Sequence, residues 1–130
     1  MSENAENPRG ELALRNLTMP RDTNPNGDIF GGWLLSQMDI AGGIVAKQRS
    51  RGRVATVAID AMTFHSPVYV GDVLCCYADI ERIGRTSLTT RIQAWVIRSA
   101  VESERIKVTE GVFTYVALNE DGRPRPVPGE

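Results

Sequence analysis

The stretch "TNPNGDIFGGWLLSQMDIAGG", Thr23–Gly43, changes from a polar loop into an apolar segment and places one carboxylate, Asp39, inside that segment. From Gly31 to about Arg49, apolar side chains fall on nearly every helical face, which predicts a helix enclosed by other structure. Asp28 is a candidate N-cap for this helix, and Gly52 a candidate stop. One sheet face cannot cover such a helix, so we expect a second copy of the chain to cover the remainder.

After the helix the hydrophobic period becomes two, which indicates strands. The strand candidates are 54–64, 72–83, 88–98 and 105–118, with a further short one at 11–17. One early helix followed by strands with short connections predicts an α+β fold, in which a curved antiparallel sheet wraps around the helix. Residues 11–118 are expected to form a single domain, flanked by a flexible arm (1–10) and a flexible tail (119–130).

Composition restricts the classes of partner. The chain has 130 residues, of which 42% are hydrophobic and 24% charged, and its formal net charge is −1. These values are typical of one soluble domain and give no basic field for nucleic acid. No apolar run reaches the roughly 18 residues that a membrane span needs. The polar, acidic N-terminus lacks the features of a signal peptide, so a cytoplasmic location is expected.

Cysteine and histidine are too sparse for a metal centre. Cys75 and Cys76 are adjacent in a predicted strand, where neighbouring side chains point to opposite faces. We interpret both as small buried hydrophobic residues rather than as a disulfide or a redox pair. His65 is the only histidine and is interpreted as a polar residue at a strand end. The prediction is therefore no metal site.

Asp39 permits two interpretations. It could lie on a solvated stripe with Ser36 and Gly43, or it could be a partly buried carboxylate that acts as a general base or nucleophile. Gly31 and Gly32 also permit two interpretations. Their position at the helix start could allow a tight entry against the sheet, or its unpartnered amides could bind a developing oxyanion.

Helix geometry limits how Gly31 and Asp39 could cooperate. They are eight residues apart, which is roughly 12 Å along the axis at 1.5 Å per residue. That separation is too large for both to act on one carbonyl within one chain. If both are catalytic, the geometry predicts a site between two subunits, with Gly31 of one facing Asp39 of the other across a two-fold axis.

Three segments resemble the YciA-type acyl-CoA thioesterases of the hotdog-fold superfamily: Asp22 to Gly43, "MTFHSPVYVGD" (62–72) and "RIGRTS" (82–87). The resemblance extends from about Leu12 to Pro126. It implies a hotdog fold, a homodimer that assembles further into a hexamer (a trimer of dimers), and hydrolysis of acyl-CoA to a free acid and CoA.

The resemblance also implies roles for individual residues. Asp39 takes the place of the catalytic acid, Asn24 that of the assisting loop residue, and Gly31 that of the backbone donor to the thioester oxygen. Many relatives have histidine where this chain has Phe30. No metal or bound cofactor is implied, since CoA is part of substrate and product. The implied substrate- and CoA-binding residues are Gly32, Gly84, Arg85, Thr86 and Ser87.

Two other functions fit the same residues. A non-enzymatic module that binds acyl-CoA or fatty acid could share the fold and the CoA loop. A thioester dehydratase is less favoured, because that chemistry usually relies on a histidine on the central helix and this helix has none. A second basic stretch, Lys47 to Arg53, is interpreted as surface charge. The preferred acyl chain length depends on tunnel depth and does not follow from the sequence.

Overall fold

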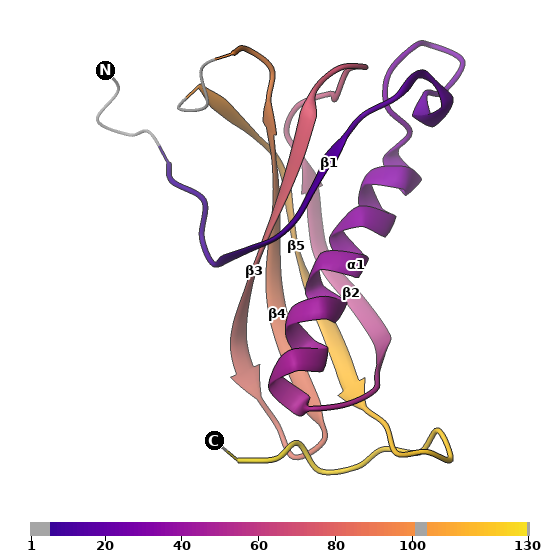
Figure 1. The fold of residues 1–130 in the computed structure, drawn as a ribbon, viewed down its shortest axis with the longest axis vertical. Coiled ribbons are helices and arrows are strands. Elements are labelled where there is room, and N and C mark those ends of the chain that lie inside the picture. Colours follow the sequence, from indigo (N-terminus) through magenta and orange to yellow (C-terminus); the bar gives the residue numbers. More distant parts are fainter. Residues whose placement is uncertain (1–5, 101–103, 130) are drawn as a thin grey trace.

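The computed structural model describes residues 6–100 and 104–129. It contains one long helix and one five-stranded sheet (Figure 1). All paired strands are antiparallel, in the order β1-β3-β4-β5-β2. The elements are β1 (Glu11–Leu17), the short 3-10 helix η1 (Pro20–Asp22), α1 (Gly31–Ser50), β2 (Val54–Phe64), β3 (Val73–Ile83), β4 (Ser87–Ile97) and β5 (Arg105–Ala117).

The predicted α+β hotdog arrangement is confirmed. Helix α1 lies along one face of the curved sheet and contacts all five strands (Figure 1). The predicted bounds of β1 and β2 are correct, and those of β3, β4 and β5 differ by one residue at one or both ends. Strands β3, β4 and β5 follow one another and pair antiparallel in that order, whereas β2 pairs with β5 at the sheet edge.

The core lies between α1 and the inner face of the sheet. The helix contributes Met38 and Ala41, both fully buried. Alternate residues of β4 point toward them, as the period-two pattern predicted, and each is 0% exposed: Leu88, Thr90, Ile92, Ala94 and Val96. Burial of these side chains supplies the main driving force for the fold, at roughly 25 cal/mol per Å² of apolar surface.

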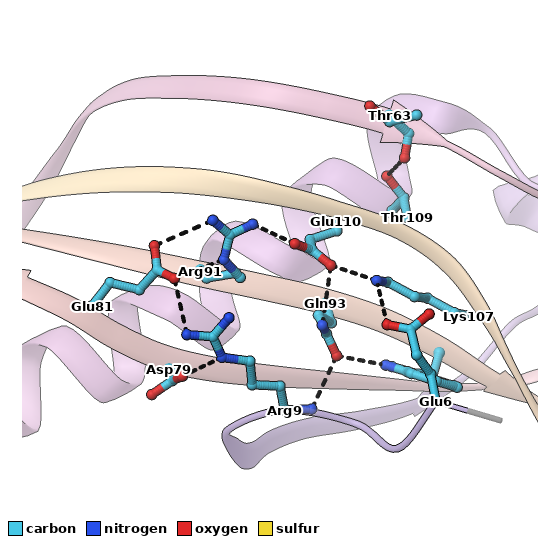
Figure 2. Close-up of polar contacts among 11 residues, drawn as sticks. Glu6, Arg9, Thr63, Asp79, Glu81, Arg91, Gln93, Lys107, Thr109 and Glu110 are labelled. Carbon is cyan, nitrogen blue, oxygen red and sulfur yellow. Dashed lines mark hydrogen bonds and ion pairs between the residues drawn. The ribbon is translucent and has the colours of Figure 1, made fainter. Parts of the chain in front are cut away.

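The outer face of the sheet carries a charged network instead (Figure 2). Glu110 accepts hydrogen bonds from Arg91 and from Gln93 and pairs with Lys107. Arg91 also bonds Glu81 at 2.8 Å. These side chains come from three adjacent strands, so the network connects β3, β4 and β5 on the side away from the helix.

Both ends of α1 differ from the prediction. Asp28 is not the N-cap; Phe30 occupies that position without a side-chain cap. Asp28 is instead held in an isolated bridge to Tyr69, two residues before the N-cap. At the other end Arg51 adopts the left-handed conformation, with φ of 60°. The Gly52 amide follows it and donates to the Lys47 carbonyl at 3.2 Å, which completes the stop.

Residues 119–129, which fall in the predicted flexible tail, contact the rest of the chain. The Arg125 guanidinium donates to the carbonyls of Ser50 and Leu118 at 3.0 and 2.9 Å. The Val127 amide donates to the Arg85 carbonyl at 2.8 Å. The tail therefore joins the end of α1 to the β3–β4 turn. These bonds satisfy carbonyls at the helix end, while the flexibility expected from the tail's proline, glycine and charge content stays a prediction.

The predicted flexible arm also makes contacts with the domain. Residues 1–5 lie outside the described residues. Within the remainder, Arg9 pairs with Asp79 at 2.8 Å and with Glu81 at 3.1 Å. Glu6 pairs with Lys107 at 3.0 Å, so this part of the arm crosses the outer face of the sheet (Figure 2). No helix among the described residues has the length and hydropathy that crossing a membrane requires.

Candidate active site

Asp39 lies where α1 meets β2 and β5. Its side chain is partly buried. The Thr56 hydroxyl, on β2, donates to Asp39 Oδ1 at 2.7 Å. The Tyr115 hydroxyl, on β5, lies 3.1 Å from the same oxygen and 3.0 Å from the Asp39 carbonyl. The carboxylate is therefore positioned by two other elements, and it is not the freely solvated side chain of the first interpretation.

The groups around Asp39 are neutral. Within residues 6–100 and 104–129, the structure records no cation paired with Asp39 and no hydrogen bond to its Oδ2. Burial, followed by the nearby Asp39 charge, raises the pKa of the Tyr115 hydroxyl far above its usual value. Tyr115 therefore stays protonated and acts as a donor. One carboxylate oxygen is held by hydroxyls and the other is available to a ligand.

Asn24 is held in the loop before the helix by its own side chain. Its Oδ1 accepts from the Asn26 amide at 2.9 Å and from the Asp28 amide at 3.2 Å. This Asx-type turn is typical of asparagine in loops. Because both bonds use the carbonyl oxygen, the side-chain NH₂ keeps its two protons for another acceptor.

A pocket of about 340 Å³ lies at the N-terminus of α1 and includes Asn24 and Gly31 in its lining. A Cβ added at Gly31 would meet no atom within 4 Å, so packing within the chain does not demand glycine there. That observation weighs against the interpretation of a tight helix entry for Gly31. At Gly32, by contrast, a Cβ would lie 3.1 Å from the Phe30 ring.

His65, which was predicted to be a polar residue at a strand end, also lines this pocket. His65 follows β2 directly, and its amide donates to the Val108 carbonyl at 2.7 Å. With Phe64 it lines the pocket opposite the helix start. His65 is thus a polar strand-end residue, as interpreted, and it also faces the candidate site.

The structure does not bring all candidate residues together within one chain. Gly31 begins α1 and Asp39 lies eight residues later, about 12 Å along the axis. The Gly84–Ser87 turn lies still further away, at the opposite end of the helix. The Thr86 carbonyl in this turn accepts a hydrogen bond from the Ala117 amide. The next residue, Leu118, donates its amide to the carbonyl of Arg53, which lies just beyond the C-terminal end of α1. One chain therefore holds three separate parts of the candidate site.

The turn itself is tight and carries a charged side chain, Arg85. The Gly84 amide donates to the Ser87 carbonyl at 2.8 Å. A Cβ at Gly84 would lie 2.7 Å from Ser87 Oγ, so a larger residue there would require the Ser87 hydroxyl to turn away. Arg85 is exposed, while its carbonyl fixes the tail. The turn could therefore present a guanidinium to an anionic ligand.

Apolar side chains are exposed on both sides of Asp39. Strand β2 is at the edge of the sheet, and Val57 on it is 59% exposed. On the helix, Ile40 and Ile44 are also exposed. Ile59 and Phe64 extend the same surface along β2. This agrees with the expectation that α1 needs more cover than one sheet face gives.

Sequence reasoning missed Thr56 and Tyr115. Tyr115 belongs to the inward-facing set of β5, together with Phe113 and Ala117, so a polar tip at an inner position was a usable signal. Thr56 had no such signal, because its role depends on how β2 passes the helix. Among the described residues, no group of three or more His, Cys, Asp or Glu side chains could hold a metal ion. Cys75 and Cys76 are buried and unpaired with each other, as predicted.

Comparison with known proteins assigns the family. The model of the "Thioesterase superfamily" matches residues 26–101, more than half of the chain. This chain belongs to the thioesterase superfamily. It is 57% identical over 123 residues to "Acyl-CoA thioester hydrolase YciA" of Salmonella typhimurium, covering 93% of this chain and 92% of that protein. It is 53% identical over 132 residues to the protein of that name in Escherichia coli, covering both chains completely.

A solved structure of a thioesterase agrees with this assignment. The hexameric thioesterase of Yersinia pestis superposes with a TM-score of 0.89 at 56% identity, covering 94% of this chain and 99% of that one. The resemblance inferred from the sequence motifs is thereby confirmed.

Proposed function

We propose that this chain is an acyl-CoA thioesterase, which hydrolyses the thioester of acyl-CoA to a carboxylic acid and CoA. The observation that carries the proposal is the state of Asp39, whose Oδ1 is fixed by two hydroxyls while its Oδ2 has no recorded partner among the described residues. Relatives at 53–57% identity bear the name acyl-CoA thioester hydrolase. A carboxylate oxygen that is open to a ligand suits a general base in this chemistry.

The active site is formed between two subunits. Antiparallel pairing of β2 with the β2 strand of a second copy would place the helix start of one chain near Asp39 of the other. It would also cover Val57, Ile40 and Ile44, which are exposed in one chain. An open apolar sheet edge is a strong driving force for such pairing. Exclusion of water by the partner would make Asp39 a more effective base.

The proposed reaction begins at the thioester carbonyl. The Gly31 amide, at the positive end of α1, donates to the carbonyl oxygen and stabilises the oxyanion. The Asn24 NH₂ group donates to the attacking water or to the same oxygen. Asp39 of the other subunit takes a proton from water, and the water oxygen bonds to the carbonyl carbon.

The tetrahedral intermediate then collapses. Its C–S bond breaks and the electron pair leaves with sulfur, giving the CoA thiolate and the free acid. A thiol pKa near 8.5 makes this departure easier than that of an alcohol. In the alternative path Asp39 attacks the carbonyl itself, and water cleaves the resulting anhydride. Both paths need the same three residues and neither needs a metal, so prolonged dialysis against EDTA should leave kcat unchanged.

CoA is held by the turn Gly84–Ser87, with Arg85 as its phosphate partner. Because this turn lies at the far end of α1 from Gly31, it serves a site that includes residues of the partner chain. Gly32 lies beside the carbonyl-binding amide and allows the thioester to approach closely. Arg85→Ala should raise KM for acyl-CoA and leave kcat nearly unchanged, since it removes binding that is equal in ground and transition states.

The dimers assemble further into a hexamer, a trimer of dimers. The Yersinia pestis relative is described as hexameric, and this chain aligns with almost its whole length. Light scattering should give the mass of six chains. A cytoplasmic location remains a prediction of the sequence, and fractionation of the source cells would check it.

The experiment that tests the function is CoA release from acyl-CoAs of short to long chain, followed with a thiol-reactive dye. Turnover of any member by the wild type is expected, and the panel then gives the chain-length preference. Binding of acyl-CoA without release of CoA from any member would contradict the proposal and leave the binding module in its place.

A further inference from the structure

Tyr115 places a phenol inside the apolar core and aims it at the candidate catalytic acid. It is 1% exposed and its ring stacks on Phe113, with centroids 6.5 Å apart. Its hydroxyl meets Asp39 at two atoms, the backbone carbonyl at 3.0 Å and Oδ1 at 3.1 Å. Most buried hydroxyls have a hydrogen-bond partner, and for Tyr115 the partner includes the side chain on which the proposed chemistry depends.

Gly42 makes this contact possible. It lies three residues after Asp39, on the face of α1 that is turned toward β5. A Cβ at Gly42 would lie 2.3 Å from the Tyr115 hydroxyl oxygen and 2.3 Å from Ile92 Cδ1. Real Cβ contacts do not approach so closely. A glycine inside a helix costs about 1 kcal/mol relative to alanine, and at this position it gives the phenol room to reach the carboxylate.

The two hydroxyls on Asp39 are not equivalent. Thr56 is exposed on β2 and donates from the open side of the site at 2.7 Å. Tyr115 donates from inside the core, through a ring that packing holds in place. A carboxylate fixed by one donor can still rotate about its last bond. With a second donor on the same oxygen from a rigid element, rotation would break both bonds, so Oδ2 keeps one direction.

We propose that Tyr115, given room by Gly42, is a positioning residue that holds Oδ1 of Asp39 so that Oδ2 is presented to the substrate. This inference rests on the proposed thioesterase function. Tyr115 itself touches no substrate, because it is buried beneath the helix. Its contribution acts through Asp39 and therefore appears in the chemical step rather than in binding.

The test is the variant Tyr115→Phe, which keeps the ring and removes only the hydroxyl. We expect kcat for acyl-CoA hydrolysis to fall about tenfold, as loss of a hydrogen bond to a charged group typically does, while KM stays unchanged. Thr90→Val is the matched control. It also removes a fully buried hydroxyl facing the core, but Thr90 Oγ1 has no hydrogen-bond partner among the described residues. That variant should keep the wild-type kcat.

A second measurement separates positioning from a general structural effect. In an Asp39→Asn background, adding Tyr115→Phe should lower the residual turnover by much less than tenfold, because residues that act as a unit are not additive. The same fractional loss in both backgrounds would overturn the proposal. So would an unchanged kcat in Tyr115→Phe, or failure of that variant to assemble like the wild type, since either leaves Tyr115 a structural residue.

The outcome for the function is read separately. If the wild type itself releases no CoA, the proposed thioesterase activity fails. If the wild type turns over and Tyr115→Phe does so equally well, only the positioning inference fails.

Discussion

The two faces of the sheet hold their carboxylates in opposite ways. On the outer face, burial would raise the pKa of Glu110, but its bonds to Lys107 and Arg91 prevail and lower the pKa below its usual value. Against the inner face, Asp39 receives only the neutral hydroxyls of Thr56 and Tyr115. A carboxylate neutralised by cations contributes stability, whereas one held by neutral donors keeps its charge and lone pairs for a ligand.

The largest expected effect is the loss of turnover in Asp39→Asn. Removal of a positioned acid–base group typically costs 10²–10⁴-fold in rate, so kcat should fall by about that factor while the assembly persists. Glu110→Gln is the matched control, because it also replaces a partly buried carboxylate with its amide. It should keep the wild-type kcat and lower stability instead. CoA release measures kcat for both variants. A large loss of kcat in Glu110→Gln would contradict the proposed difference between the carboxylates of the two faces.

Thr56→Val should have an intermediate effect. The substitution keeps the shape of the side chain and removes the hydroxyl that donates to Asp39 at 2.7 Å. We expect kcat to fall about tenfold with little change in KM. Thr63→Val is the control, because it makes the same substitution on β2 at a side chain that has no recorded bond to Asp39. Equal kcat values for Thr56→Val and wild type would show that the hydroxyl does not help to position the acid.

The outer network predicts a dependence of stability on pH. The hydrogen bond from Arg91 lowers the pKa of Glu81 from its usual 4.5, and the pKa of Glu110 is lowered too. A carboxyl with a lowered folded-state pKa contributes stability that is fully present above the unfolded value and is lost as pH falls through the folded value. Arg91→Met should therefore lower the free energy of unfolding at neutral pH.

Arg91 is about one quarter exposed, so the loss should be about 1–2 kcal/mol, and the difference from wild type should shrink below about pH 4.5. Urea unfolding at fixed protein concentration measures it, since assembly makes apparent stability concentration-dependent. Arg85→Met, at an exposed turn, is the control. A difference that persists undiminished at pH 3 would contradict the account.

The smallest expected effect concerns the cysteines. Burial, with a smaller contribution from Cys75, raises the pKa of the Cys76 thiol to about 12. The thiolate is the reactive form, so native protein should react with a thiol dye far more slowly than protein unfolded in guanidinium. Fast reaction of two thiols per native chain would show that β3 is less enclosed than the structure indicates.

The sequence was sufficient for the fold because its signals are local and consistent. The period-two strands at 54–64 and 105–118 and the apolar helix have lengths that only an enclosed antiparallel arrangement accommodates. Asp39, Asn24 and Gly31 were found because they sit in a continuous motif. Thr56 and Tyr115 were missed because they lie 17 and 76 residues from Asp39, and only the packed sheet brings them to it.

The errors occurred where long-range contacts override local tendency. Asp28 is a good capping residue, yet its bridge to Tyr69 holds it in an extended segment. A contact that the composition of the tail does not indicate is the bond from Arg125 to the end of α1. Neither contact can be predicted from the residues that are close to it in the sequence.

A site shared between subunits is the central claim, and complementation of two inactive variants tests it most directly. Asn24→Ala and Asp39→Asn would be co-expressed and purified together, with each variant alone as reference. In a mixed dimer one site then carries both changes and the other carries neither. In a random one-to-one mixture, half of the dimers are mixed, and each mixed dimer has one intact site out of two. Turnover should therefore recover to about a quarter of wild type. Turnover no higher than the average of the two variants alone would show that Asn24 and Asp39 act within one chain, and would contradict the account.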